Sequence, residues 1–212
     1  MKLDKVPEVV IQRLPRYYRY LGELLEEKTD RISSMELSRR MGLTSSQIRQ
    51  DFCSFGEFGL QGYGYNVKYL REEIGKILDL DRMKRMIVVG AGNLGQALAN
   101  YQFDKVGFEL IGIFDINPRL NGFAIRNIKV MMMDALESFV QENQVDIAVL
   151  TIPEGAALDV GMYLEKTGIR AIWNFTPVDL NTMLHICVKN VHLDENLMTL
   201  AYEYKNLLKK QA

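Results

Sequence analysis

A GxGxxG motif at residues 90–95 constrains the fold of this chain more than any other feature. The run before it, Met86-Ile87-Val88-Val89, predicts a buried strand, and the residues after it have helical spacing through Ala97, Leu98 and Tyr101. A strand, a glycine-rich turn and a helix in this order open a Rossmann βαβ unit, whose glycines permit the tight turn and a close backbone approach to a pyrophosphate. The predicted phosphate-binding residues are Gly90, Ala91, Gly92, Asn93, Leu94 and Gly95.

An acidic residue stands where such a motif needs one. The run Leu110–Phe114 predicts a second strand that ends in Asp115, and Asp115 and the next residue, Ile116, belong to the expected cofactor-binding set. A carboxylate at this position accepts hydrogen bonds from the adenosine ribose. It also repels a 2′-phosphate, so we expect NAD(H) to be preferred over NADP(H).

Further βα units follow the motif. The pattern predicts helices over 134–143 and 154–167, and strands over 145–152 and 169–173. Ligands bind at the carboxyl ends of strands in open parallel sheets. We therefore predict a doubly wound parallel sheet, and add five residues at strand ends to the expected cofactor-binding set: Thr151, Pro153, Asn174, Phe175 and Pro177.

The first 80 residues predict a different kind of domain. Ser33 with Glu36 and Thr44 with Gln47 are two capping boxes, and Gly42 lies between the helices that they open. Two short capped helices joined through a glycine are typical of a helix-turn-helix. The glycine-aromatic stretch 55–65 predicts a tight hairpin, the wing of a winged helix.

The second of these helices carries side chains suited to reading bases. Its amino-terminal half supplies amides, hydroxyls and a guanidinium from Ser45, Ser46, Gln47, Arg49 and Gln50, with Ile48 and Phe52 expected to face inward. Arg39 and Arg40 on the preceding helix are expected to contact phosphates. The competing interpretation is a helical hairpin with a solvated polar face, and the adjacent hairpin favours DNA binding over it.

A last helix is expected from Asp194, as N-cap, to Lys209 and Lys210. Leu197, Ala201, Tyr204 and Leu208 form one apolar stripe on it. The helix either packs on its own sheet or is lent to a partner subunit. The expected organisation is 1–80 winged helix, 81–192 Rossmann domain and 193–212 dimerisation helix.

Composition excludes several other classes. The net charge is −1, so the prediction of DNA binding rests on the motif and not on a basic field. The two cysteines lie far apart without a CxxC partner, which argues against a disulfide framework or a zinc site and favours the cytoplasm. The longest apolar runs are too short to span a bilayer.

An enzyme is the more distant alternative. Tyr101 and Lys105 spell YxxxK, which resembles the catalytic pair of short-chain dehydrogenases but comes too early in the chain. The two histidines, His185 and His192, have no carboxylate partner that the sequence identifies. Few residues follow the Rossmann segment, too few for a substrate domain, so we predict no catalytic residue and no metal site. A small NAD-dependent oxidoreductase, and a regulator responding to coenzyme A or another adenine nucleotide, are the alternatives.

Taken together, the motifs resemble the Rex family of redox-sensing repressors over essentially the whole chain. The segments that carry the resemblance are residues 13–19, 45–65 with Arg49-Gln50-Asp51-Phe52, the glycine motif, Asp115 and 174–177. The resemblance implies a homodimer on a palindromic AT-rich operator, released when NADH binds between the subunits, with the last helix swapped into the partner. It completes the expected DNA-binding set with Arg16, Gln61, Gly62, Tyr63 and Lys68. At the wing this chain has Leu60 and Gln61 where the family often carries basic residues, and Lys68 offers a compensating charge.

Overall fold

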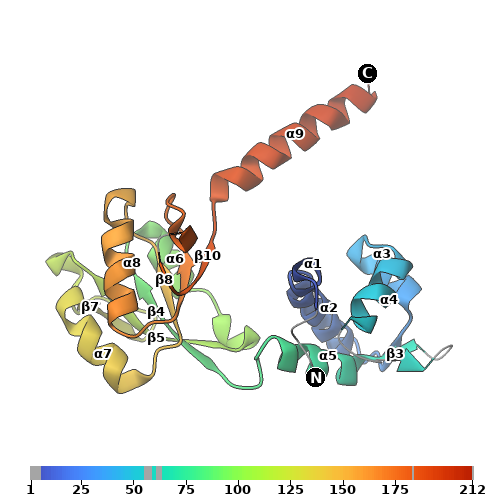
Figure 1. The fold of residues 1–212 in the computed structure, drawn as a ribbon, viewed down its shortest axis with the longest axis horizontal. Coiled ribbons are helices and arrows are strands. Elements are labelled where there is room, and N and C mark those ends of the chain that lie inside the picture. The colour runs from blue at the N-terminus through green and yellow to red at the C-terminus, as the bar shows by residue number, and fades with distance from the viewer. Residues whose placement is uncertain (1–5, 55–58, 61–63, 183, 212) are drawn as a thin grey trace. The chain divides into compact units, whose positions relative to one another are not determined.

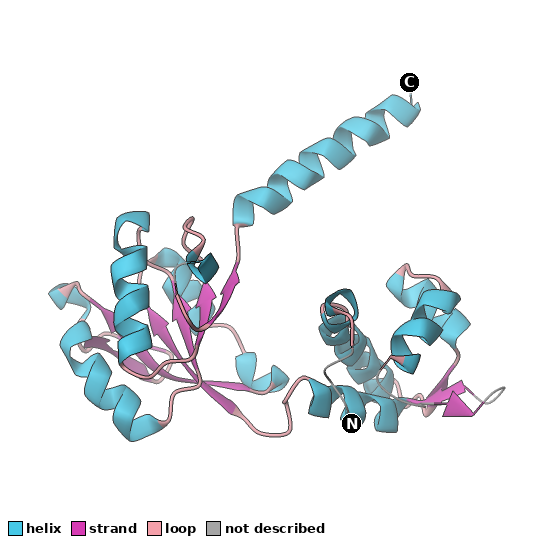
Figure 2. Ribbon diagram, viewed as in Figure 1, coloured by secondary structure: helices cyan, strands magenta, loops and turns pink. Residues whose placement is uncertain are grey.

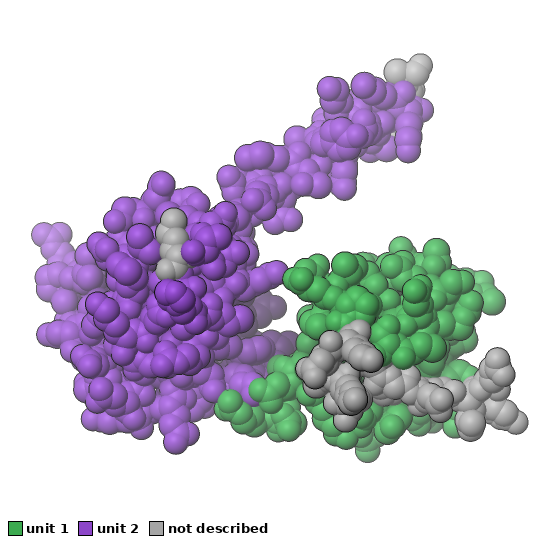
Figure 3. Space-filling model, in the orientation of Figure 1, with its two compact units in different colours: residues 1–82 green, residues 83–212 purple. Residues whose placement is uncertain are grey.

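The computed structural model describes residues 6–54, 59–60, 64–182 and 184–211. The chain divides into two compact units, residues 1–82 and 83–212, coloured separately in Figure 3. The boundary expected after residue 80 thus falls after Arg82, and the last helix groups with the second unit. Among the described residues no helix combines the length and apolarity needed to cross a membrane.

Unit 1 is a helical bundle with a small antiparallel sheet (Figure 1). In chain order its elements are α1 (Glu8–Ile11), α2 (Leu14–Glu26), β1 (Arg31–Ile32), α3 (Ser34–Met41), α4 (Ser45–Cys53), β2 (Gly59–Leu60), β3 (Gly64–Asn66) and α5 (Val67–Ile77). Pro15 lies in the first turn of α2, where a missing backbone N–H costs nothing. The strands pair in the order β1-β3-β2, so the expected hairpin is present and β1 adds a strand that the sequence did not predict.

The helix-turn-helix forms as the capping pattern predicts. The backbone N–H of Glu36 donates to Ser33 Oγ at 3.1 Å, and that of Gln47 donates to Thr44 Oγ1 at 3.1 Å. Gly42 ends α3 with φ +65°, a left-handed conformation that glycine adopts without strain. These three positions fix the start of both helices and the turn between them.

One apolar core holds unit 1 together. Ile48 and Phe52 of α4 are buried, as expected for its inward face, and pack with buried side chains from α2, α3 and α5. The Phe52 ring lies 4.9 Å from the Tyr17 ring and 4.9 Å from the Tyr65 ring, centroid to centroid. The amphipathic helices therefore bury one face each, and the opposite face of α4 is left to solvent.

Unit 2 is an open, twisted sheet of seven strands in the order β10-β9-β8-β4-β5-β7-β6 (Figure 2). The strands are β4 (Lys84–Val89), β5 (Phe108–Asp115), β6 (Ala124–Ile125), β7 (Ile128–Met132), β8 (Ile147–Leu150), β9 (Ala171–Asn174) and β10 (Cys187–Asn190). All pairs are parallel except β6 with β7. The α-helices are α6 (Asn93–Ala99), α7 (Leu136–Asn143), α8 (Ala157–Lys166) and α9 (Leu193–Gln211). Short 3₁₀ turns η2 to η6 cover Phe103–Val106, Pro118–Leu120, Met133–Ala135, Glu154–Ala156 and Leu180–Thr182.

The sheet is a doubly wound Rossmann sheet, as expected. Successive residues of β4 enter opposite cores: Ile87 and Val89 pack with α7 and α8, while Met86 and Val88 pack on the other face with Ala99 of α6. Because β4 lies between β5 and β8, the chain reverses its direction of winding there. Such a switch point brings the carboxyl ends of adjacent strands together to form a binding crevice.

Two details of the expected helices are wrong. α6 ends at Ala99, so Tyr101 lies beyond it and Lys105 lies in a separate 3₁₀ turn. α9 begins at Leu193, so Asp194 lies in its first turn and is not the N-cap. Asp194 still lies at the positive end of the helix dipole, which is where acidic residues are favoured, and this explains why the sequence pattern predicts it as the N-cap.

Candidate functional site

One face of α4 presents polar groups to solvent. Ser46, Arg49 and Gln50 are exposed, and Ser45 and Gln47 are half-buried. The guanidinium of Arg49 donates to Ser46 Oγ at 3.1 Å and to Ser34 Oγ at 3.3 Å. These partners are neutral hydroxyls, so the positive charge of Arg49 is not offset by a carboxylate in those contacts. A guanidinium held in this way retains the charge and donors that a guanine edge accepts.

The basic residues expected around α4 have different partners. Arg39, Arg40, Arg16 and Lys68 are all exposed. Arg40 makes a two-point ion pair with Glu27, at 2.9 and 3.0 Å, and this guanidinium lowers the pKa of the Glu27 carboxyl. Arg39 donates to Met35 Sδ at 3.6 Å, and Arg16 donates to the carbonyl of Met41. The wing residues Gln61, Gly62 and Tyr63 lie outside the described residues.

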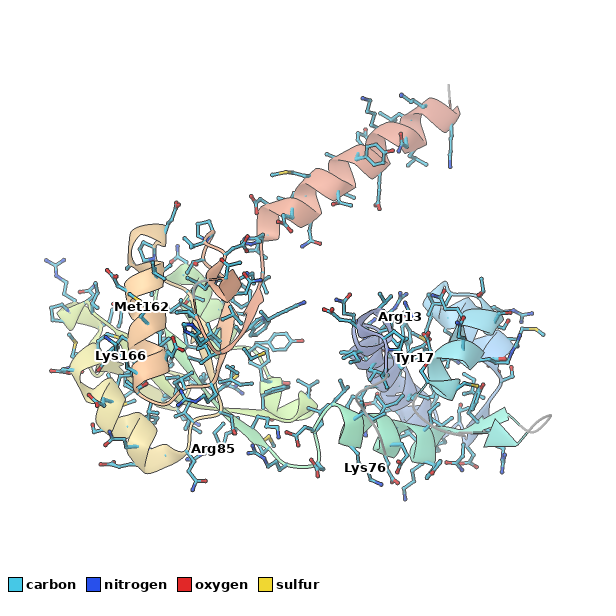
Figure 4. The ribbon with its side chains drawn as sticks, viewed as in Figure 1. Arg13, Tyr17, Lys76, Arg85, Met162 and Lys166 are labelled. Carbon is cyan, nitrogen blue, oxygen red and sulfur yellow. The ribbon has the colours of Figure 1, made fainter. Side chains whose placement is uncertain are left out.

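A buried ion pair fixes α4 against α2. The Asp51 carboxylate accepts from Arg13 Nε at 2.8 Å, from Arg13 Nη2 at 2.7 Å, and from the Tyr17 hydroxyl at 2.7 Å. Arg13 and Tyr17 project from the start of α2, as Figure 4 shows. Burial raises the pKa of Tyr17, and its hydrogen bond to Asp51 raises it further. The orientation of the exposed face of α4 is therefore set from its buried side by contacts among three side chains, which the sequence analysis named for the family resemblance without predicting that they meet.

The glycines of residues 90–95 have the roles expected of each. A Cβ at Gly95 would lie 1.8 Å from the Gly90 carbonyl oxygen, so α6 and β4 pack only because residue 95 is glycine. Gly90 has φ +102°, and a Cβ there would lie 2.5 Å from the Thr151 carbonyl oxygen. Gly92 has open space where its Cβ would be, just before the first residue of α6. An anion can approach the backbone there, beside N–H groups that the helix leaves unpaired.

Asp115 lies across from this loop and organises it. One carboxylate oxygen accepts the backbone N–H of Ala91 at 2.6 Å, and the other accepts that of Asn117 at 2.7 Å. Thr151 directly follows β8, the neighbour of β4 on its other side, and its Oγ1 donates to the Gly90 carbonyl at 2.8 Å. Each carboxylate oxygen keeps a lone pair for a ribose hydroxyl, so Asp115 can position the loop and bind a nucleotide at once.

The ends of β4, β5, β7 and β8 surround one pocket of about 420 Å³. Six residues of the expected cofactor set line it: Gly90, Gly92, Asp115, Ile116, Thr151 and Pro153. Asn93 is exposed at the start of α6, Leu94 is half-buried and Ala91 is buried. The structure thus brings residues from four segments of the sequence to one concave surface.

Three residues of the expected set lie elsewhere. Asn174, Phe175 and Pro177 are not part of this pocket lining. Asn174 is fully buried, and its side chain bonds to Val178, Asn190 and Thr176. A side chain with no exposed surface cannot touch a ligand in this conformation, so Asn174 acts on the loop that follows β9. Phe175 packs its ring 4.6 Å from that of Trp173.

The pocket has lining residues that the sequence analysis missed. Met133, Ile152, Ala156 and Val160 complete its apolar wall. Met133 directly follows β7, a strand that was not predicted because its Ile-Lys-Val-Met-Met run has no clear alternation. The rule that ligands lie at strand ends would have identified Met133 once β7 was recognised.

Both histidines have carboxylate neighbours that only the fold reveals. His192 Nε2 lies 3.0 Å from Asp179 Oδ1, and His185 Nδ1 lies 3.7 Å from Glu165 Oε1. The His185 side chain is 94% exposed and that of His192 is 17% exposed. Among the residues that the structure describes, no group of three or more His, Cys, Asp or Glu side chains is placed to hold a metal ion.

A capped helix-turn-helix with a wing, joined to a Rossmann sheet with a nucleotide cradle, defines a DNA-binding regulator with a nucleotide-sensing domain. A family model described as "Putative DNA-binding protein N-terminus" matches residues 5–53, and one described as "CoA binding domain" matches residues 81–178. The chain is 52% identical over 202 residues to the redox-sensing transcriptional repressor Rex of Clostridium novyi, covering 95% of this chain and 96% of that relative. It is 54% identical to Rex of Clostridioides difficile, covering 92% and 94%. The chain belongs to the Rex family of redox-sensing transcriptional repressors.

Solved structures agree with this assignment. The structure of RSP in complex with beta-NAD+ and operator DNA has a TM-score of 0.88 and 52% identity, covering 97% of this chain and 96% of that chain. RSP in complex with beta-NADH has a TM-score of 0.86 and 49% identity, covering 98% and 99%. RSP is described as a Rex-family repressor. These relatives are named as repressors and not as enzymes, so the oxidoreductase alternative has no support among them.

Proposed function

We propose that this protein is a transcriptional repressor that binds operator DNA through unit 1 and is released when NADH binds to unit 2. The observation that carries the proposal is the presence on one chain of two surfaces of different kinds: the exposed polar face of α4 and the pocket lined by Gly90, Gly92 and Asp115. The relatives solved with beta-NAD+ and operator DNA and with beta-NADH support the same pairing of ligands.

The pocket residues fit a dinucleotide. Gly92 leaves room for the pyrophosphate, and the first N–H groups of α6 donate to it. Asp115 accepts the adenosine ribose hydroxyls with its remaining lone pairs, and its charge disfavours a 2′-phosphate. When bound, the nicotinamide supplies the redox state that is sensed. Asn174 contributes by holding the loop after β9, and Phe175 and Pro177 belong to that loop.

The DNA site divides into residues that read bases and residues that contact phosphates. Arg49, with Gln47 beside it, reads bases from the amino-terminal half of α4, where Ser45, Ser46 and Gln50 also lie. The phosphates are contacted by Arg16, Arg39, Arg40 and Lys68. The wing contacts the DNA backbone next to them through Gln61, Gly62 and Tyr63. Arg40 must exchange Glu27 for a phosphate to do so.

The operator requires two copies of unit 1, and α9 is the element that joins them. Its apolar side chains are exposed within the described chain, among them Leu197 at 66%, Leu200 at 57% and Tyr204 at 60%. A helix with such a stripe is stabilised by covering it, and a second copy offers that cover. Analytical ultracentrifugation of the chain lacking residues 194–212 tests this role: we expect monomers where the full chain gives dimers.

Two exposed cysteines without a disulfide, Cys53 and Cys187, together with operator DNA and NAD(H) as ligands, support a cytoplasmic location.

The function is tested by selecting bound sequences from random duplex DNA, alone and with NADH, NAD⁺ or coenzyme A. We expect a palindromic site to be enriched, retained with NAD⁺ and lost with NADH. Coenzyme A is the matched ligand because a family model described as a CoA binding domain covers residues 81–178. Release by coenzyme A and not by NADH would contradict the proposal and show that the protein responds to coenzyme A.

A further inference from the structure

A chain of side-chain hydrogen bonds connects the end of β9 to the beginning of α9. Asn174 Nδ2 donates to Asn190 Oδ1 at 2.9 Å, and Asn190 Nδ2 donates to Asp179 Oδ1 at 2.8 Å. The same Asp179 oxygen lies 3.0 Å from His192 Nε2. We call Asp179, Asn190 and His192 the latch.

The chemistry of these groups fixes which atom donates. A carboxylate only accepts, so His192 Nε2 must carry a hydrogen in order to bond to Asp179. The amide of Asn190 is oriented by three neighbours, because Asn174 donates to its oxygen while Asp179 and Asn181 accept from its nitrogen. The hydrogen bond to Asp179 also raises the pKa of His192. Each hydrogen bond in the latch therefore has a defined donor and a defined acceptor.

The latch lies between the two parts of unit 2 that the proposed function must connect. On one side, His192 directly precedes Leu193, the first residue of α9. On the other, Asn174 pairs with Leu150 across β8 and β9, and the next residue, Thr151, lines the nucleotide pocket. The backbone follows the same route, because the Val191 N–H donates to the Asn174 carbonyl at 2.8 Å.

We propose that His192, held by Asp179, is a positioning residue that transmits the state of the nucleotide pocket to α9. The proposal rests on the proposed function, in which α9 joins the subunits and NADH opposes operator binding. In the conformation described here the latch is closed, which fixes the direction in which α9 leaves β10. Coupling requires an element whose arrangement differs between the two states, and opening of the latch is that difference.

The test measures coupling separately from binding, with the full-length chain and an operator obtained by selection. Operator affinity is measured by fluorescence anisotropy without and with saturating NADH, and their ratio is the coupling factor. For His192→Ala we expect a coupling factor about fivefold smaller than in the wild type, the size of one partly exposed charge-assisted hydrogen bond. The affinities for operator alone and for NADH alone should each stay within about threefold.

Two variants separate positioning from a general structural role. His192→Gln restores the coupling, because its terminal amide donates to Asp179 as Nε2 does. His185→Ala is the matched control, since it removes the chain's other histidine from an exposed site, and it leaves coupling unchanged. A coupling factor for His192→Ala equal to that of the wild type, or a glutamine variant no better than alanine, would overturn the proposal.

Asp179→Ala keeps the test decisive if His192→Ala does not fold, because the Asp179 side chain is 67% exposed. It should lower the coupling factor at least as much as His192→Ala does, because Asp179 also accepts from Asn190, and the double variant should lose no more than Asp179→Ala alone. Additive losses would show that the two residues act independently and would refute the latch. A wild-type chain that does not respond to NADH would instead refute the proposed function, and with it the role of the latch.

Discussion

Replacing Asp51 with asparagine should destabilise unit 1 by about 3 kcal/mol while leaving unit 2 unaffected. Asp51 is 2% exposed and accepts three hydrogen bonds, two from Arg13 and one from Tyr17. An asparagine amide replaces one accepting oxygen with a donor, so at least one bond is lost and the rest no longer reach a charged acceptor. Breaking a buried ion pair costs about 3–5 kcal/mol, and the lower end applies because the Arg13 side chain is 20% exposed and regains water.

The single tryptophan makes the measurement specific to one unit. Trp173 lies in β9, so its fluorescence during urea unfolding reports unit 2 and should not change. Hydrogen exchange of peptides from α4 reports unit 1, and the free energy of opening calculated from their protection should fall by about 3 kcal/mol. Glu72→Gln is the matched control, an exposed carboxylate of α5 in the same unit, with an expected change within about 0.5 kcal/mol. A change below about 1 kcal/mol for Asp51→Asn would refute the reasoning.

Three further predictions concern ligands. Asp115→Ala should weaken NADH about tenfold and narrow its advantage over NADPH, measured by calorimetry, whereas equal binding of the two nucleotides by the wild type would contradict the assigned role. Arg49→Ala should lose about 1–3 kcal/mol of binding free energy on the selected operator and little on random DNA, whereas Arg39→Ala should weaken binding to both DNAs equally. An equal loss on both DNAs for Arg49→Ala would show that Arg49 contacts a phosphate and does not read a base. Glu27→Gln removes the carboxylate that Arg40 must leave, so affinity for random DNA should rise while the salt slope stays the same, because Arg40 contacts a phosphate in both proteins; an unchanged affinity would argue against this exchange.

Local signals in the sequence predicted the elements that carry both sites. Ser33, Thr44 and Gly42 each act on the helical turn next to them in the sequence, so the capping pattern located the start of α4 at Ser45, as observed. The glycines and Asp115 were equally predictable, because a tight turn and a strand end impose these residue types at a fixed spacing. The carboxylate of Asp115 does reach the glycine loop, at 2.6 Å from the Ala91 nitrogen.

Contacts between distant segments were not predictable in the same way. Asp51 and Arg13 lie 38 residues apart, and nothing in either local pattern points to the other. The same holds for Asp179 and His192, and for β10, whose four residues alternate too briefly to distinguish a strand from a loop. Asn174 was expected at the ligand because it follows a strand, yet its burial shows that strand ends also hold residues that only shape the loop.

The central claim is that NADH and operator DNA oppose each other through one protein, and a reciprocal binding measurement tests it most directly. Binding energies are linked, so operator must weaken NADH by the same factor by which NADH weakens operator, typically about 5–150-fold. NADH affinity is measured by calorimetry with and without saturating operator, and compared with operator affinity with and without saturating NADH. We predict two equal factors well above one. NADH affinities that agree within error in the two conditions would contradict the account.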